Sequence, residues 1–219
     1  MRKTFVVLMV LALMVPAFAF GKPPAQEQAT VASAYMIDNF EDGEITASPE
    51  WWVFDNVTTM FKRNPAKGAY SLALTGKAID WYVGGMGTYL AKGELDLSQY
   101  SYIEMDIYSA GPENGSLKIE LYDDDNGNWQ IEQDPKKAYA PVFDDRFVYE
   151  QKIDWSGWKR VAVPFSSFVD NNPNAGDNIW NPQKQNASGG LLQMQLIAVA
   201  GSKTGAIDYC LDNIKFTLR

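Results

Sequence analysis

Residues 155–168 read Trp-Ser-Gly-Trp-Lys-Arg-Val-Ala-Val-Pro-Phe-Ser-Ser-Phe, and this stretch decides the fold class. Between residues 158 and 163 the side chains alternate, so one face of an extended segment carries Trp158 and Arg160 while the other face is apolar. Pro164 then ends the hydrogen-bonded ladder, because proline has no backbone N–H. The pattern predicts a β-strand with one apolar face and one polar, aromatic face.

Short alternating runs of this kind recur along the chain, and no segment of convincing length has a helical period. Other strands are expected near Met36–Phe40, Trp51–Thr59, Ser71–Thr75, Trp81–Leu90, 102–108, Leu117–Asp125, Arg146–Ile153, Leu191–Val199 and Ile207–Leu218. The pair Asn126-Gly127 is typical of a two-residue turn and predicts a hairpin between 117–125 and 128–132. Many short strands without helical crossovers predict an all-β fold, an antiparallel β-sandwich.

The N-terminal residues have the pattern of a signal peptide, with Arg2 and Lys3 before an apolar run and a small-x-small site at 17–19. We therefore expect a signal peptide over 1–19, a disordered lead over 20–34 and one β-sandwich domain over 35–219. The protein is expected to be exported, to a periplasm or to the extracellular medium. No other segment has the roughly 20 apolar residues that a membrane helix needs, so membrane insertion is not expected. Cys210 is the single cysteine, which excludes a disulfide within the chain.

The charge and composition exclude several classes of function. The net charge is −8, so the chain lacks the excess of basic residues that phosphate contacts require, and we expect no nucleic-acid partner. Histidine is absent, which removes histidine-based triads, most zinc sites and the commonest general base. A cation or a neutral polymer is the kind of partner that fits an acidic surface.

Four motifs occur in a fixed order along the chain. They are Ile37-Asp38-Asn39-Phe40-Glu41-Asp42-Gly43, Lys67-Gly68-Ala69-Tyr70-Ser71-Leu72, the segment 158–168 and Leu211-Asp212-Asn213-Ile214-Lys215-Phe216. The set resembles family 11 carbohydrate-binding modules and the related complex I intermediate-associated protein family. The resemblance covers nearly all of 35–218 and implies a galactose-binding-like jelly roll.

The resemblance also implies a structural calcium ion where the first and last strands of the jelly roll meet. Its hard oxygen ligands would be Glu41, Asp38 or Asp42, Asp212 and a backbone carbonyl near Lys67. The alternative is that Asp38 and Asp212 only cap strand ends. A second acidic run, 123–127, does not have the glycine position of an EF-hand loop, and we expect it to be a solvated hairpin tip.

The chain has 7 Trp, 11 Tyr and 11 Phe, which serve either as core or as a platform for sugar rings. Sugar binding requires aromatic and hydrogen-bonding side chains on one exposed face. Strand parity predicts such a face from Tyr108, Tyr122, Trp158, Arg160, Asp106, Glu120, Gln193 and Gln195.

Further binding positions follow from the resemblance. Trp81 and Tyr82 fall where the family places a stacking tyrosine, Asp125 in the segment leading to Trp129 falls near a hydroxyl-binding aspartate, and Gln193 replaces another aspartate. Other positions depart from the family: its arginine, aspartate and tyrosine after Ser-Ser-Phe are here Asn171, Pro173 and Asn174, and a later tyrosine is Val199. These departures predict a different sugar or a different orientation.

Glu104 and Asp106 alternate on one strand, as carboxylates do in some β-sandwich glycoside hydrolases, but Tyr108 stands where a third carboxylate would be. We therefore expect no enzymatic activity. The sequence favours a secreted carbohydrate-binding domain that binds a polysaccharide of the β-glucan type by aromatic stacking. The alternative is a protein-interaction or structural role, as an assembly factor or a cell-surface or flagellar sheath subunit.

Overall fold

The computed structural model describes residues 33–46, 49–90, 97–137, 139–182 and 190–218. Within them the chain forms fourteen strands and two short 3₁₀ helices. The strands are β1 (Ala34–Asp38), β2 (Trp51–Asp55), β3 (Thr58–Lys62), β4 (Ser71–Lys77), β5 (Tyr82–Tyr89), β6 (Tyr102–Ser109), β7 (Ser116–Asp124), β8 (Gln133–Asp134), β9 (Ala140–Pro141), β10 (Asp145–Lys152), β11 (Gly157–Pro164), β12 (Val169–Asp170), β13 (Gly190–Val199) and β14 (Ala206–Thr217). The 3₁₀ helices are η1 (Pro135–Lys137) and η2 (Phe165–Ser167).

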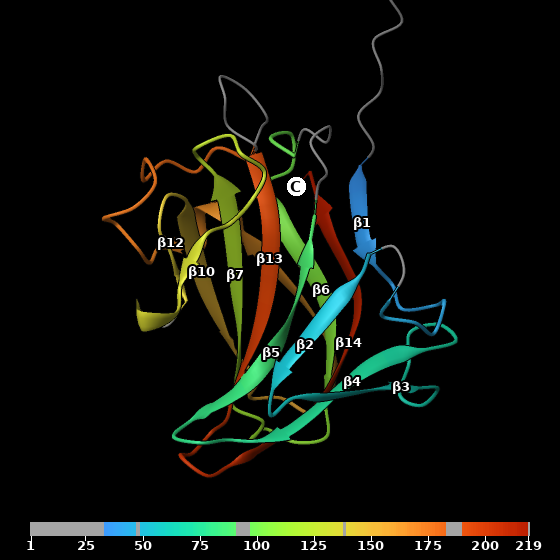
Figure 1. Cartoon of the computed structure of the whole chain (residues 1–219). Helices are drawn as coiled ribbons and strands as arrows, with labels where there is room; N and C mark the ends of the chain where they lie inside the picture. The colour runs from blue at the N-terminus through green and yellow to red at the C-terminus, as the bar shows by residue number, and fades with distance from the viewer. Residues whose placement is uncertain (1–32, 47–48, 91–96, 138, 183–189, 219) are drawn as a thin grey trace, which may run out of the picture. The chain divides into compact units, whose positions relative to one another are not determined.

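Two antiparallel sheets form the sandwich (Figure 1). The first sheet has the order β11-β6-β14-β4-β3, and β1 also pairs with β14. The second sheet has the order β12-β10-β7-β13-β5-β2, and β8 pairs with β9 separately. The predicted all-β, antiparallel sandwich is confirmed.

The core lies between the sheets and is built by alternation. Residues 103, 105 and 107 of β6 and residues 117, 119 and 121 of β7 belong to one buried apolar cluster. Leu211, Ile214 and Phe216 of the last strand pack into the same cluster. The opposite side of each of these strands is therefore left for polar contacts, as a period of two residues requires.

One predicted strand is in fact two. The segment 51–59 was expected to be continuous, but β2 ends at Asp55, whose φ is 56°, and β3 begins at Thr58. β2 pairs with β5 in the second sheet and β3 pairs with β4 in the first sheet. The left-handed residue turns the chain so that it passes from one sheet to the other, with Val57 buried between.

The predicted hairpin at Asn126-Gly127 is wrong. β7 pairs with β10 and β13, and residues 125–132 form a loop. The Asp124 carboxylate accepts the backbone N–H groups of Gly127 (2.7 Å) and Trp129 (2.6 Å), and so replaces the strand pairing with a side-chain turn.

The predicted signal peptide and all but two residues of the predicted lead lie outside the described residues. β1 begins at Ala34, one residue before the expected start of the domain. In the described part of the chain no helix is long and apolar enough to cross a membrane.

Candidate functional site

A pocket lies on the second sheet, and its shape begins with the glycines of β5. The segment 83–87 reads Val-Gly-Gly-Met-Gly, in which Val83 and Met86 are buried in the core. A Cβ on Gly87 would lie 2.4 Å from Cζ2 of Trp52, and a Cβ on Gly85 would lie 2.8 Å from Cζ of Phe54. The absence of side chains on β5 thus lets two rings of the neighbouring strand lie directly against it.

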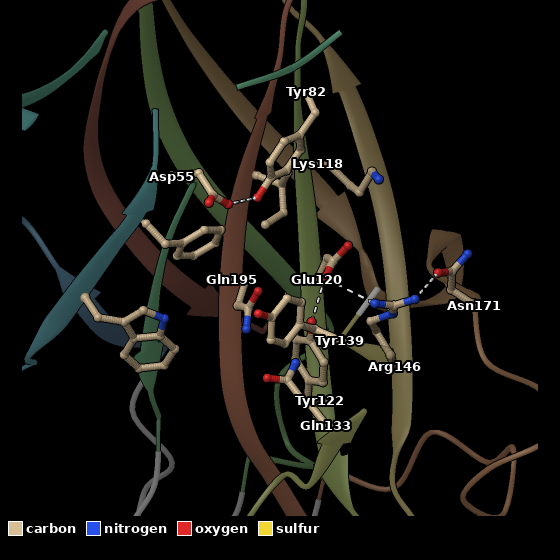
Figure 2. A pocket seen from close by; sticks show the side chains of 13 residues that line it. Asp55, Tyr82, Lys118, Glu120, Tyr122, Gln133, Tyr139, Arg146, Asn171 and Gln195 are labelled. Carbon is tan, nitrogen blue, oxygen red and sulfur yellow. Dashed lines mark hydrogen bonds and ion pairs between the residues drawn. The ribbon is translucent and has the colours of Figure 1, made fainter. Parts of the chain in front are cut away.

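The pocket has a volume of about 560 Å³ and mixes aromatic with hydrogen-bonding side chains. Its lining, most of it labelled in Figure 2, consists of Trp52, Phe54, Asp55, Tyr82, Lys118, Glu120, Tyr122, Gln133, Tyr139, Arg146, Asn171, Gln195 and Ile197. These residues come from β2, β5, β7, β8, β10 and β13 and from two loops. Concave sites that mix apolar rings with a few polar groups are typical of small-molecule binding.

One side of the pocket is a charged network, centred on Glu120 (Figure 2). Tyr122 donates its hydroxyl to Oε2 of Glu120 at 2.6 Å, and Nη1 of Arg146 lies 3.9 Å from the same oxygen. Nη2 of Arg146 donates to Oδ1 of Asn171 at 2.6 Å. Nε of Arg146 is buried and has no hydrogen-bond partner among the described residues.

Tyr82 stands at the other side of the pocket and is held in place by Asp55. Its hydroxyl donates to Oδ2 of Asp55 at 2.5 Å, while 40% of the residue surface stays exposed. Burial and the carboxylate of Asp55 raise the pKa of Tyr82, and burial and Glu120 raise the pKa of Tyr122. Both phenols are therefore neutral hydrogen-bonding groups at ordinary pH.

Exposed aromatic rings continue the pocket along the sheet. The rings of Trp52 and Tyr89 are 5.2 Å apart, and Tyr89 is 51% exposed. Tyr139, in the turn after η1, is 61% exposed and lines the pocket from the loop side. The arrangement suits a neutral ligand that presents both apolar faces and hydroxyl groups.

Four of the predicted binding residues line this pocket, namely Tyr82, Glu120, Tyr122 and Gln195. Gln193 is level with Tyr122 and Tyr89 in the second sheet but is only 3% exposed and does not line the pocket. Trp81 precedes β5 in a left-handed conformation, and its carbonyl accepts the N–H of Ala200. Trp81 thus packs beside the β13–β14 turn rather than in the pocket.

Tyr108 does not share a face with Tyr122, contrary to the prediction. Tyr108 lies in β6 of the first sheet, where its ring is 5.6 Å from that of Trp158 in β11. Strand parity predicts on which side of its strand a residue lies, but not to which sheet the strand belongs. The predicted face therefore combined residues from the surfaces of two different sheets.

Asp125 and Trp129 belong to the loop after β7 and do not line the pocket. Asp125 lies with Asp123 and Asp145 in a cluster at the end of the second sheet. Burial, followed by the charges of neighbouring carboxylates, raises the pKa of Asp123 to about 9 and that of Asp145 to about 7. The expected solvated tip at 123–127 is therefore wrong, because Asp123 and Asp124 are fully buried.

The structure brings together three of the four predicted calcium ligands. Glu41 accepts the backbone N–H groups of Ala69 (2.8 Å) and Tyr70 (3.3 Å), and Asp212 accepts that of Lys67 (2.9 Å). Burial, with a smaller contribution from the charge of Glu41, raises the pKa of Asp212 to about 6.

Of the two residues predicted for the fourth ligand, Asp42 accepts the backbone N–H of Glu44 (3.0 Å), and Asp38 is engaged elsewhere. Its two oxygens accept hydrogen bonds from the backbone N–H of Phe40 (2.7 Å) and from Nε1 of Trp51 (2.8 Å). Asp38 therefore stabilises the chain around β1 and β2.

Most of the pocket was not among the predicted site residues. The missed residues include the two rings of β2, Arg146 and Tyr139. The repeated glycines at 85 and 87 were the available signal, because alternate glycines on one strand mark a place where something else approaches the backbone. No local pattern points to Tyr139, which reaches the pocket from a loop.

The fold and the site define a jelly-roll β-sandwich with a pocket on one sheet. A comparison with protein-family models and with curated sequences finds no match.

Among solved structures, a family 11 carbohydrate-binding module from Clostridium thermocellum in complex with a β-1,3-1,4-mixed-linked tetrasaccharide is 21% identical. Its TM-score is 0.57, with 85% of this chain and 97% of that chain covered. The family 11 module of the cellulosomal cellulase Lic26A-Cel5E of the same organism is 18% identical. Its TM-score is 0.55, with 86% of this chain and 96% of that chain covered.

The chain therefore has the fold of these modules, and the predicted jelly roll is confirmed. The comparisons give no support to the resemblance to complex I intermediate-associated proteins.

Proposed function

We propose that the chain is a carbohydrate-binding domain that binds a polysaccharide in the pocket of the second sheet. The observation that carries this proposal is the pocket itself, in which Trp52 and Tyr82 flank hydrogen-bonding groups. Sugar rings have apolar C–H faces that pack on aromatic rings and hydroxyls that pair with carboxylate, amide and guanidinium groups. The pocket supplies both kinds of contact on one surface.

A polysaccharide fits better than a single sugar, because the aromatic rings extend beyond the pocket. Tyr89 continues the row from Trp52 along the sheet, and Tyr139 stands over the other side. A β-glucan is the class we propose, since a family 11 module of the same fold was solved in complex with a β-1,3-1,4-mixed-linked tetrasaccharide. Arg146 and Asn171 would determine the selectivity of the pocket for the fine structure of the ligand.

The function proposed is binding without catalysis. Glu104 and Asp106, the carboxylates with hydrolase-like spacing, pair with Lys215 and Arg160. In the pocket Glu120 accepts from Tyr122 and faces Arg146. We expect no release of reducing sugar from any polysaccharide that is bound.

We further propose export of the chain, on the basis of the signal pattern at 1–19. The expected mature protein begins at Phe20. N-terminal sequencing of protein recovered outside the cytoplasm tests this, and an unprocessed Met1 in that fraction would contradict it.

A structural calcium ion between Glu41 and Asp212 is part of the proposal. The backbone of Gly68 is so close to Glu41 that a Cβ there would lie 2.2 Å from Oε1, so the 67–70 loop already forms a cradle around the carboxylate. The carboxylates of Glu41 and Asp212 and a carbonyl near Lys67 are oxygen donors of the kind that calcium prefers. Asp212→Asn is expected to lower the stabilisation that calcium gives in a thermal melt.

Affinity electrophoresis of the full chain tests the binding function. Native gels containing mixed-linkage β-glucan, xylan, mannan or galactan are compared with a gel that contains no polysaccharide. Retardation in the β-glucan gel, abolished by Arg146→Ala but kept by Lys77→Ala, is the expected result. Unchanged mobility of the folded protein in all gels would contradict the proposal and favour the alternative role in protein interaction.

A further inference from the structure

The acidic cluster at the end of the second sheet is separate from the pocket and from Glu41 and Asp212. Asp123 in β7 lies opposite Asp145 in β10, and Asp125 follows β7. One carboxylate oxygen from each of the three residues lies within 4.8 Å of the other two. Two oxygens on opposite sides of a calcium ion, each at roughly 2.4 Å, would have this separation.

The three carboxylates hold the loop between β12 and β13 in a regular way. One oxygen of each carboxylate accepts a backbone N–H from every second residue of the loop. The N–H of Asp177 donates to Asp125 at 3.3 Å, that of Ile179 to Asp145 at 3.2 Å, and that of Asn181 to Asp123 at 3.0 Å. The loop is thereby fixed against the strand ends, and its donors are satisfied on one side of the cluster.

The remaining oxygen of each carboxylate is buried and has no hydrogen-bond partner among the described residues. The side-chain oxygen of Asn181 is in the same condition. Asp123 and Asp145 are fully buried, so water does not solvate their unpaired oxygens. A buried acceptor without a partner is costly, and a buried charge without a partner is more so.

The surrounding charges do not offset this cost. None of the ion pairs in the described part of the chain includes Asp123, Asp125 or Asp145. The loop covers the cluster with Gly176, where a Cβ would lie 2.0 Å from Oδ1 of Asp145 and 2.4 Å from Oδ2 of Asp125. The cluster is thus an enclosed, oxygen-lined site formed by three carboxyl groups with no basic partner among the described ion pairs.

We propose that Asp123, Asp125 and Asp145 bind a calcium ion, with the side-chain oxygen of Asn181 as a further ligand. Calcium takes six to eight oxygen ligands in irregular geometry, whereas magnesium usually keeps several of its waters. Zinc prefers nitrogen and sulfur ligands, which are not in this group. The unpaired oxygens of the cluster are the donors that a calcium ion requires.

The ion would join the β12–β13 loop to the second sheet. The loop carries Trp180, whose ring packs 5.2 Å from Phe147 and 5.1 Å from Phe165. It begins beside Asn171, which binds Arg146 in the pocket. Calcium at this site is therefore expected to stabilise both the core under the loop and one wall of the pocket. The cation site itself does not depend on what the pocket binds.

Calcium titration of the full chain, stripped of metal with a chelator, tests the proposal. Binding is followed by calorimetry and by the rise in melting temperature, with magnesium as a comparison ion. Asp145→Asn is expected to lose one calcium ion per chain, or at least tenfold in affinity for it. Asp80→Asn, an exposed carboxylate paired with Lys203, is the matched control and is expected to bind calcium as the wild type does.

Two further variants keep the test decisive. Asp212→Asn removes a ligand of the other proposed ion and should leave the binding event that Asp145→Asn removes. Asp125→Asn changes the least buried member of the cluster, and it replaces Asp145→Asn if that variant does not fold. A folded Asp125→Asn or Asp145→Asn chain with the wild-type calcium stoichiometry and affinity would overturn the proposal.

Discussion

The two sheets place similar side chains on the faces turned away from the core, but these side chains pair closely on the first sheet and surround a pocket on the second. On the first sheet Arg160 makes two hydrogen bonds to Asp106, at 3.1 and 2.9 Å, and Tyr108 packs against Trp158. On the second sheet the nearest approach of Arg146 to Glu120 is 3.9 Å.

The glycines of β5 explain this difference. β6 and β11 carry side chains at every position that faces away from the core, and among them Asp106 pairs with Arg160 and Tyr108 packs against Trp158. β5 has glycine at positions 85 and 87, so the rings of Trp52 and Phe54 pack directly against the backbone of β5 and leave space beside them. A mixture of aromatic and charged residues is therefore not sufficient for a binding site. Unpaired groups around a hollow are also needed.

The largest expected difference between the faces comes from their arginines. Arg146→Ala removes a charged hydrogen-bonding group that lines the pocket, which should cost about 1.5–3 kcal/mol of binding energy, or about 10- to 100-fold in affinity. Calorimetric titration with a β-glucan oligosaccharide measures this.

Arg160→Ala is the matched change on the first sheet and should leave sugar affinity unchanged. Asp106 then loses its partner, so stability should fall by about 1 kcal/mol, a modest value because half of the Arg160 side chain is exposed. Urea denaturation measures the loss. A drop in sugar affinity for Arg160→Ala would place the site on the wrong sheet.

A smaller difference is expected between the tyrosines. Tyr82→Ala removes a ring that Asp55 holds at the pocket. Burial of this ring against a sugar should contribute about 1.5 kcal/mol of binding free energy, so its loss should lower affinity about tenfold. Tyr108→Ala removes a ring of the first sheet and should not change affinity. Equal losses in the two variants would contradict the distinction between the faces.

The smallest expected effect belongs to Gln195, a neutral side chain in the middle of the pocket. Gln195→Ala should lower affinity about fivefold, because one hydrogen bond between neutral groups contributes about 1 kcal/mol. Gln193→Ala is its control, since Gln193 is buried and does not line the pocket. Gln193→Ala should lower the melting temperature more than it lowers affinity.

The sequence was sufficient to predict the fold because its signals are local. The alternation of apolar and polar residues predicted which side of β6, β7 and β11 is apolar, and the order of the short motifs predicted a jelly roll. The two errors of secondary structure have local causes that are visible only in the structure. Asp55 adopts a left-handed conformation, and Asp124 binds the backbone of its own loop.

The site could be predicted only in part because it depends on sheet membership. Tyr82, Tyr122 and Gln195 lie on strands that pair or neighbour in the second sheet, whereas Tyr108 has the same parity in the first sheet. Which strands pair is decided by contacts between segments far apart in the chain, as for Arg146 and Asn171, and alternation carries no information about it.

The most direct test of the account is an NMR titration of the ¹⁵N-labelled protein with a mixed-linkage β-glucan tetrasaccharide. Both faces carry a tryptophan, so the indole Nε1–H signals of Trp52 and Trp158 report on them in one experiment. The account predicts shifts at Trp52 and at the backbone amides of Gly85 and Gly87, with Trp158 unchanged. Shifts confined to Trp158 and its neighbours on β6 and β11, or no shifts at all, would contradict it.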